Sequence, residues 1–256
     1  MYVKALHNGC KCLELDCWDG SRDRFNKNIP VVKHGHTLTS QITFVDVITV
    51  VREYVEDNPE TYPIILSLEN HCSLKYQQEI VEILKCSPGE MLYKPATVNE
   101  RSTKDMPSPN YLRGKVLIKG KKSTPSEEEN DEEQRDASLR KIGILPELAA
   151  LALLDGISFK SFDASIDQDC FQMHSIQENK MNKIIEKNEE DIIKWRHYNA
   201  NHLTRTFPKF FLRFDSSNYN PLIAWAMGCQ LVALNIQVIT IIYNLFIMRL
   251  MNTGYF

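Results

Sequence analysis

An α/β fold built on a parallel sheet is the class that this sequence predicts, and three observations support it. Short apolar runs with strand-like alternation are followed by longer stretches with helical spacing. Polar and acidic side chains stand where the strand-like runs end. An acidic segment, 123–138, interrupts the pattern before it resumes. Alternation of strands and helices in this way favours parallel strands that are covered by helices.

The elements can be assigned in order along the chain. Before the acidic segment, the sequence predicts helices at 40–56 and 74–84 and strands at 11–18, 31–34, 64–68 and 116–118. After that segment, it predicts one long helix at 179–197 and strands at 157–159 and 231–235. The acidic segment itself is nearly devoid of apolar residues, which predicts a solvated, flexible linker.

Composition and charge exclude some classes of protein. The 256 residues carry a formal net charge of -3 and have a pI of about 6.2. This balance argues against a nucleic-acid-binding protein, and it provides no general attraction to anionic membranes. The chain has seven cysteines, an odd number, and its first residues do not resemble a signal peptide. We therefore expect reduced thiols in a cytoplasmic protein.

The segment 231–248 is strongly apolar and is about as long as a minimal membrane span. It also contains Asn235, Gln237 and Asn244, which are costly in lipid unless they find partners. The sequence therefore favours a buried strand followed by an apolar tail over a transmembrane helix.

Three carboxylates stand near the ends of predicted strands. Glu14 and Asp16 point to the same face of the first strand because strand side chains alternate, and Glu69 follows the third strand. Carboxylates that converge repel one another unless a cation lies between them, and oxygen ligands suit calcium or magnesium. The three acids are therefore a candidate metal site, with ordinary salt-bridge partners as the alternative.

Histidine and lysine side chains add to this group. His34 is a candidate general acid or base, although spacing alone does not exclude His36 or His71 from that role. Lys119 and Lys121, in the sequence KGKK, stand at the end of the fourth strand. Both can reach one anionic ligand such as a phosphate, and a solvated loop is the alternative.

Several motifs together resemble a known family. The sequence GCKCLELDCWDG begins at residue 9, followed by HG at 34, LSLENHCS at 66 and KGKK at 119. These resemble the X half of the eukaryotic phosphoinositide-specific phospholipases C. Between residues 211 and 237, DSSNYNP and GCQLVALN resemble the Y half. The resemblance places the X half at 1–122, the linker at 123–140, the Y half at 141–237, and a tail that matches no motif at 238–256.

This resemblance implies an incomplete, distorted TIM (β/α)8 barrel, split into X and Y halves by the acidic linker. It implies calcium-dependent hydrolysis of phosphatidylinositol 4,5-bisphosphate to inositol 1,4,5-trisphosphate and diacylglycerol, through a cyclic phosphodiester. The expected setting is intracellular signalling by a cytoplasmic protein that is peripheral to the inner face of the plasma membrane. The expected partner is a phosphoinositide headgroup, and no nucleic acid is expected.

The resemblance also assigns roles to individual residues. Three match ligands of Ca²⁺: Glu14, Asp16 and Glu69. Two match catalytic groups, with Glu14 as the general base and His34 as the general acid. Five match contacts to the headgroup: Lys119, Lys121, Ser175, Arg205 and Phe207. Phe207 stands where the family has a tyrosine against the inositol ring.

Two family motifs have no counterpart in this sequence. They are the first strand with SHNTY and the glycine-rich final strand. A barrel without them would have open edges, so we expect the chain as written to be inactive or nearly so. The alternatives are a non-catalytic phosphoinositide-binding pseudoenzyme or scaffold, and a glycerophosphodiester phosphodiesterase, which also uses an E-x-D strand. The retained acids and His34 favour the phospholipase.

Overall fold

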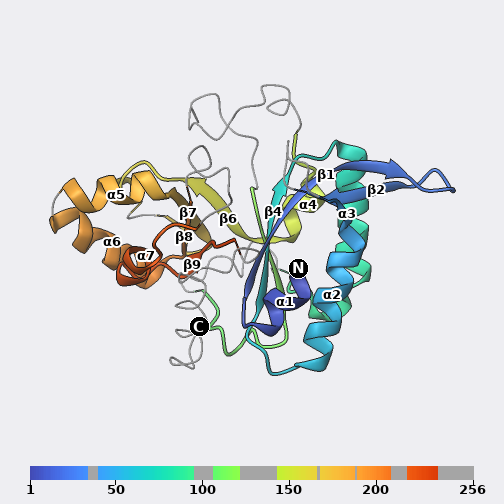
Figure 1. Cartoon of the computed structure of the whole chain (residues 1–256), viewed down its shortest axis with the longest axis horizontal. Helices are drawn as coiled ribbons and strands as arrows, with labels where there is room; N and C mark the ends of the chain where they lie inside the picture. Colours follow the sequence, from blue (N-terminus) through green and yellow to red (C-terminus); the bar gives the residue numbers. More distant parts are fainter. Residues whose placement is uncertain are drawn as a thin grey trace.

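The chain is organised around one curved sheet. A computed structural model describes residues 1–33, 40–94, 106–121, 143–165, 168–187, 189–208 and 218–235. Within them the sheet has nine strands in the order β3-β2-β1-β4-β5-β6-β7-β8-β9 (Figure 1). The two edge strands, β3 and β9, are not paired with each other in the described part of the chain, so the barrel is not closed. The predicted class, an incomplete α/β barrel, is confirmed.

Most of the strands are parallel. The parallel set is β1 (Cys12–Arg22), β4 (Ile64–Asn70), β5 (Val116–Gly120), β6 (Ala152–Ser158), β7 (Gln172–Gln177), β8 (Thr204–Phe207) and β9 (Leu231–Val232). The remaining strands, β2 (Asn28–Val32) and β3 (Ile42–Thr43), pair antiparallel at one edge. Because the parallel strands share one direction, their carboxyl ends meet at one end of the barrel.

Helices cover the outer face of the sheet. In chain order they are α1 (Tyr2–His7), α2 (Phe44–Asp57), α3 (Leu74–Cys86), α4 (Pro146–Leu151), α5 (Glu178–Lys187), α6 (Glu189–Asn201) and α7 (Leu222–Ala226). Short 3-10 turns lie at Gly89–Met91 and Asp163–Ser165. In Figure 1, α2 and α3 lie on one side of the sheet, and α5, α6 and α7 lie on the other.

The outer core of the first half forms between α2 and the sheet. The apolar stripe of α2, which includes Val47 and Val51, is fully buried with Leu66 from β4. Helix α2 begins where the Thr43 side chain accepts a hydrogen bond from the Asp46 amide at 3.2 Å. Such a cap stabilises a helix start by about 1 kcal/mol.

The inner face of the sheet is layered. Towards the amino ends of the strands, Leu117, Leu153 and Met173 are buried in one apolar cluster. Two residues further along β5, on the same face as Leu117, stands Lys119. The barrel interior therefore changes from an apolar floor to a polar layer as the strands approach their carboxyl ends.

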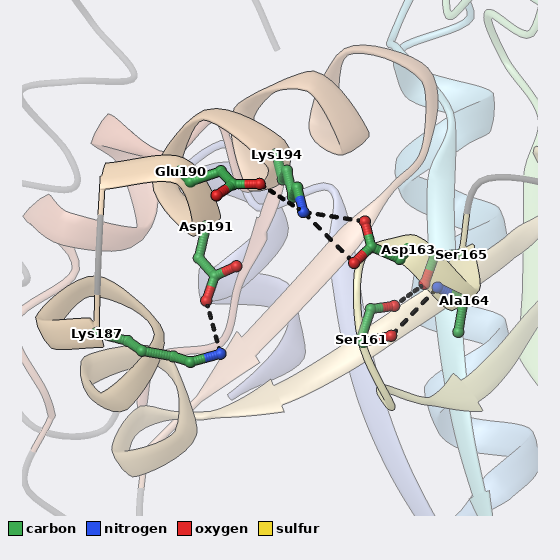
Figure 2. Close-up of polar contacts among 8 residues, drawn as sticks. All are labelled: Ser161, Asp163, Ala164, Ser165, Lys187, Glu190, Asp191 and Lys194. Atoms are coloured by element: carbon green, nitrogen blue, oxygen red, sulfur yellow. Dashed lines mark hydrogen bonds and ion pairs between the residues drawn. The ribbon is translucent and has the colours of Figure 1, made fainter.

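Ion pairs join the helices of the second half to the loop that follows β6 (Figure 2). The Lys194 ammonium of α6 lies 3.0 Å from Asp163 and 2.9 Å from Glu190. Lys187, at the end of α5, lies 3.2 Å from Asp191 near the start of α6. The contact of Lys194 with Asp163 joins α6 to the turn at Asp163–Ser165, and the contact of Lys187 with Asp191 joins α5 to α6.

Two predicted elements were wrong in detail. The second strand is antiparallel to its neighbour, with Cys17 opposite Val32, because β1 and β2 form a hairpin. Apolar alternation indicates a strand but carries no information on its direction. The predicted helix 179–197 is two helices, α5 and α6, and residue 188 between them is outside the described residues. Strands β7 and β8 were not predicted, although Ser175 and Arg205 lie on them.

No membrane-spanning helix is found in the described part of the chain. Within the apolar segment 231–248, residues 231–232 form strand β9, and residues 236–248 lie outside the described residues. None of the seven cysteines forms a disulfide, as the sequence predicts.

Candidate active site

The predicted carboxylates converge near the carboxyl end of the segment over which β1 and β4 pair. In the register between β1 and β4, Glu14 stands opposite Ser67 and Asp16 stands opposite Glu69. All four side chains therefore point to the same face of the sheet. One ligand atom from each of Glu14, Asp16 and Glu69 lies within 4.8 Å of the other two. The expectation that the three acids face one point agrees with this geometry.

A buried arginine reaches this group from the opposite wall. Arg205 on β8 forms an ion pair with Glu14 on β1, across 191 positions of sequence. The Arg205 side chain is 9% exposed and the Glu14 side chain is 34% exposed. The guanidinium is therefore buried, and the Glu14 side chain is partly open to solvent.

The electrostatics of the three acids differ. Burial alone would raise the pKa of Glu14, but the Arg205 guanidinium, a hydrogen bond with Glu69 and the charge of Lys119 together outweigh it and lower that pKa to about 2. Burial and the charge of Glu14 raise the pKa of Asp16 to about 7. Glu69 keeps part of its surface open to solvent, yet burial of its carboxylate and the charge of Glu14 raise its pKa to about 8. The cluster holds more negative charge than one arginine neutralises.

This donor set fits a hard divalent cation. It consists of oxygen atoms only, which suits calcium or magnesium rather than zinc. Two carboxyl groups with raised pKa values are what a site for a cation shows when only protons and Arg205 balance its charge. Glu14, Asp16 and Glu69 are therefore the residues that would hold such an ion.

Lys119 belongs to the same layer. It stands next to Ser67 in the register between β4 and β5, and its ammonium donates a hydrogen bond to the Ser67 hydroxyl at 3.0 Å. Burial, followed by the charge of Arg205, lowers the pKa of Lys119. A Cβ on Gly156 of β6 would lie 3.4 Å from Lys119 Cε, an ordinary van der Waals contact, so Gly156 lies beside this side chain. The barrel thus contains a buried cation that an anionic ligand would stabilise.

The other predicted headgroup residues differ in burial and in their position along the strands. Ser175 is half-buried on β7, directly opposite Arg205 in the register between β7 and β8. The Arg205 guanidinium carbon lies 4.6 Å from the centre of the Phe207 ring. Lys121 is exposed just beyond the end of β5. His34, the predicted general acid, is outside the described residues.

Two residues of this site were not singled out from the sequence. Ser67 shares a face with Glu69 two positions later in LSLE, so strand alternation could have identified it. Gly156 could not have been found in that way, because its place beside Lys119 depends on which strand lies beside β6.

A surface cavity of about 420 Å³ lies elsewhere, lined by Lys85, Gly89, Glu90, Leu92 and Lys94. Leu92 pairs with Val116 at the start of β5, so this cavity is at the amino end of the strands. It is therefore not part of the carboxylate site.

The raised pKa values predict how pH affects the metal-free protein. Asp16 and Glu69 hold protons more tightly in the folded state, so their stabilising contribution is present at low pH and is lost as pH rises through about 7 to 8. Glu14 has the opposite sign, but its contribution is lost only as pH falls through about 2. In EDTA, we expect the thermal midpoint to fall by about 5 °C between pH 6.5 and 9.

Thermal melts with and without calcium test this dependence. Calcium is expected to remove most of the fall, because a bound cation stabilises the ionised carboxylates. Asp16→Asn should reduce the fall in EDTA, whereas Asp57→Asn, at an exposed position, should leave it unchanged. A midpoint that rises over this pH range in EDTA would contradict the prediction. Below pH 6.5 another group interferes, since burial lowers the pKa of His174 to about 4.

Comparison with known families accounts for this arrangement. Residues 1–122 match the X domain of phosphatidylinositol-specific phospholipase C, and residues 148–255 match its Y domain. The chain belongs to the phosphatidylinositol-specific phospholipase C family. The Y-domain match continues through residues 238–255, where the sequence motifs showed no resemblance to the family. The boundaries of the X half, the linker and the Y half that the motifs indicate remain predictions.

Curated phospholipase C relatives match most of this chain. Human 1-phosphatidylinositol 4,5-bisphosphate phosphodiesterase delta-1 is 34% identical, over 92% of this chain and 33% of the relative. The mouse delta-3 protein is 38% identical, over 92% and 31%. Human inactive phospholipase C-like protein 2 is 36% identical, over 92% and 22%. The chain therefore spans a third or less of the length of these relatives.

Solved structures agree with the fold. PLC21 from S. officinalis has a TM-score of 0.79 and 34% identity, covering 97% of this chain and 32% of that structure. A Ca²⁺-dependent phosphatidylinositol-specific phospholipase C from Streptomyces antibioticus has a TM-score of 0.51 and 16% identity, covering 80% and 75%. At 16% identity, the similarity to the Streptomyces antibioticus enzyme concerns the fold alone.

Proposed function

We propose that this chain hydrolyses phosphatidylinositol 4,5-bisphosphate to inositol 1,4,5-trisphosphate and diacylglycerol in a calcium-dependent reaction, at a low rate because its sequence has no counterpart of the SHNTY strand or of the glycine-rich final strand. The observation that carries the proposal is the convergence of three carboxylates with two buried cations, Lys119 and Arg205, at one end of the barrel. Such a site can hold a divalent ion and an anionic headgroup side by side. The names of the delta relatives support this substrate.

Glu14 is the proposed general base. In the proposed reaction the inositol 2-hydroxyl attacks the phosphorus, its proton passes to Glu14, and the bond to the glycerol oxygen breaks. A carboxylate with a pKa of about 2 is a weak base. If a substrate phosphate draws Arg205 away, the pKa of Glu14 rises and the carboxylate becomes a better proton acceptor.

The remaining residues bind, orient and protonate. His34 is the proposed donor of a proton to the glycerol oxygen, and water then opens the cyclic phosphodiester. Asp16 and Glu69 would hold calcium together with Glu14, and a bound calcium ion supplies acidification of the attacking hydroxyl and neutralisation of phosphate charge. Lys119, Lys121 and Ser175 are proposed contacts to the headgroup phosphates, with Phe207 against the ring.

Headgroup selectivity should follow from the buried cations. Lys119 is buried and its pKa is lowered, so an added phosphate that restores its charge is favoured over a neutral hydroxyl. We place the reaction at the cytoplasmic face of the plasma membrane, where this lipid would be met by a peripheral protein.

Release of inositol phosphates from lipid in mixed micelles tests the proposal. The full chain should release inositol 1,4,5-trisphosphate with calcium and none with EGTA, and it should prefer the bisphosphate lipid over phosphatidylinositol. Hydrolysis of glycerophosphocholine without turnover of any inositol lipid would instead indicate a glycerophosphodiester phosphodiesterase.

A non-catalytic phosphoinositide-binding protein is the second candidate. One observation favours it: an inactive phospholipase C-like protein matches this chain as well as the delta enzymes do. Two measurements distinguish the candidates: headgroup binding by calorimetry and lipid turnover. Binding of inositol 1,4,5-trisphosphate that is weakened by Lys119→Met, with no lipid turnover in calcium, would establish the binding protein.

A further inference from the structure

The hairpin formed by β1 and β2 extends beyond the rest of the sheet. The last parallel pair between β1 and β4 is Cys17 with Asn70, but β1 continues for five more residues to Arg22. Strand β2 then returns antiparallel from Asn28. Figure 1 shows this hairpin projecting from the body of the molecule beside α3. It leaves the sheet at the carboxyl end of β1, which is also the end that carries the carboxylate site.

The end of this hairpin, residues 22–27 (the hairpin tip), has a defined shape. The Asp23 carboxylate accepts hydrogen bonds from the amides of Phe25 and Lys27, each at 2.8 Å. The Asp23 amide donates to the Lys27 carbonyl at 3.0 Å, and Arg22 donates to the Asn26 side chain at 2.8 Å. Since these bonds already order the backbone, the tip loses little conformational entropy when it binds a partner.

The hairpin is also attached to α3. Lys27 lies 3.2 Å from Glu79 of α3, and the Tyr76 hydroxyl donates to the Gly20 carbonyl at 2.7 Å. A Cβ on Gly20 would collide with the Ile29 carbonyl, so glycine allows the two strands to approach at this point. The contacts of Lys27 with Glu79 and of Tyr76 with Gly20 hold the hairpin against α3.

The hairpin tip exposes an aromatic ring between cations. Phe25 is 75% exposed, the highest fraction for any large hydrophobic residue in the described part of the chain. The Arg24 guanidinium carbon lies 4.7 Å from the centre of its ring. Arg22 and Arg24 are exposed, whereas the charge of Asp23 is directed at backbone amides and Lys27 is paired with Glu79. The outward face of the tip is therefore apolar at one point and positively charged around it.

We propose that the hairpin tip is a contact site for anionic membrane surfaces. Phe25 would enter the interfacial layer of the bilayer, while Arg22 and Arg24 bind lipid phosphates. The inference rests on the proposed function, in that a lipid substrate requires the barrel to meet a membrane. A net charge of -3 provides no general attraction, so a local cationic site is needed.

The size and shape of the tip favour a membrane over a protein partner. A stable protein interface buries on the order of 800 Å² on each side, which a six-residue projecting turn cannot supply. A lipid surface needs no matching cavity, and single aromatic and arginine side chains contribute to interfacial binding independently.

Sedimentation with vesicles tests this site. The full chain is mixed with vesicles of phosphatidylcholine, alone or with about 30 mol% phosphatidylserine, in EDTA and without any phosphoinositide. We expect partition onto the anionic vesicles only. Phe25→Ala should weaken it about tenfold, and Arg22→Glu or Arg24→Glu should each weaken it by about fivefold or more.

An exposed aromatic at the other end of the strands provides a matched control. Tyr111 is 74% exposed in the segment that leads into β5, and Tyr111→Ala should leave partition unchanged. Circular dichroism and thermal melts check that each variant is folded. The proposal is overturned if the chain does not partition, if the tip variants partition like the original chain, or if Tyr111→Ala has the same effect. If the tip variants differ from the original chain in oligomeric mass without vesicles, the tip is a contact between copies of the chain, and the proposal is also overturned.

The outcomes are separable from those of the proposed reaction. Hydrolysis of water-soluble inositol 1,2-cyclic phosphate reports on the barrel site without a membrane, and Phe25→Ala should not alter it. Partition that depends on Phe25 in a chain without turnover would support the tip and refute the reaction. Lipid turnover by the chain, together with tip variants that partition normally, would support the reaction and refute the membrane contact at the tip.

Discussion

Glu14→Gln is expected to lower calcium-dependent turnover of phosphatidylinositol 4,5-bisphosphate by about 1,000-fold or more. The amide cannot accept the proton of the attacking hydroxyl, and general bases typically contribute 100- to 10,000-fold, as an order of magnitude. The variant also removes one of the three negative charges that would hold calcium. Folding should persist, because glutamine is nearly isosteric and still offers Arg205 an acceptor.

Initial rates in micelles, measured beside calcium titrations, check this result. Glu60→Gln is the matched control, because the Glu60 side chain is 85% exposed and pairs with Arg113 away from the barrel interior. Its rate should equal that of the original chain. Retention of more than about a tenth of the rate by Glu14→Gln would show that another group is the base.

Arg205→Met is expected to destabilise the metal-free chain by about 2–3 kcal/mol. Removal of one partner from a buried ion pair typically costs about 3–5 kcal/mol, and the partial exposure of Glu14 reduces that figure through solvent screening. The variant leaves three converging carboxylates that Lys119 alone must neutralise. Calcium should restore much of the loss, because the added cation replaces the missing guanidinium.

Urea unfolding in EDTA and in calcium measures both effects. Lys187→Met, which breaks a surface ion pair with Asp191 in which the lysine side chain is 70% exposed, should change the free energy of unfolding by no more than about 0.5 kcal/mol. The double variant Arg205→Met, Glu14→Gln should be more stable in EDTA than the sum of the single changes. Equal losses in EDTA and in calcium would refute the argument.

The sequence was sufficient for the parts of the site that depend on local spacing. Glu14 and Asp16 share a face because strand side chains alternate, and Glu69 lies opposite Asp16 because β4 pairs in parallel with β1. The first relation needs only the existence of the strand, and the second needs the expectation of a parallel sheet with polar groups near the carboxyl ends of its strands. The carboxylate cluster could therefore be placed before any coordinates were known.

The parts that depend on long-range pairing could not be found in the same way. The ion pair between Glu14 and Arg205 joins opposite walls of the barrel, and neither residue type nor spacing indicates that contact. Strands β7 and β8 are short and rich in polar residues, so no apolar run marks them. The direction of β2 was missed because a hairpin and a parallel crossover give the same alternation.

The ion pair of Arg205 with Glu14 also has a thermodynamic consequence. In the metal-free chain, the Arg205 guanidinium balances part of the negative charge that a divalent cation would otherwise balance. A cation bound to the three acids weakens the attraction of Glu14 for Arg205, so Arg205 becomes free to bind a phosphate. A phosphate bound to Arg205 leaves the negative charge of the acids uncompensated, which favours binding of a cation. By reciprocal linkage, each ligand should raise the affinity for the other by the same factor. One shared counter-ion is enough to make the binding of metal and lipid headgroup cooperative.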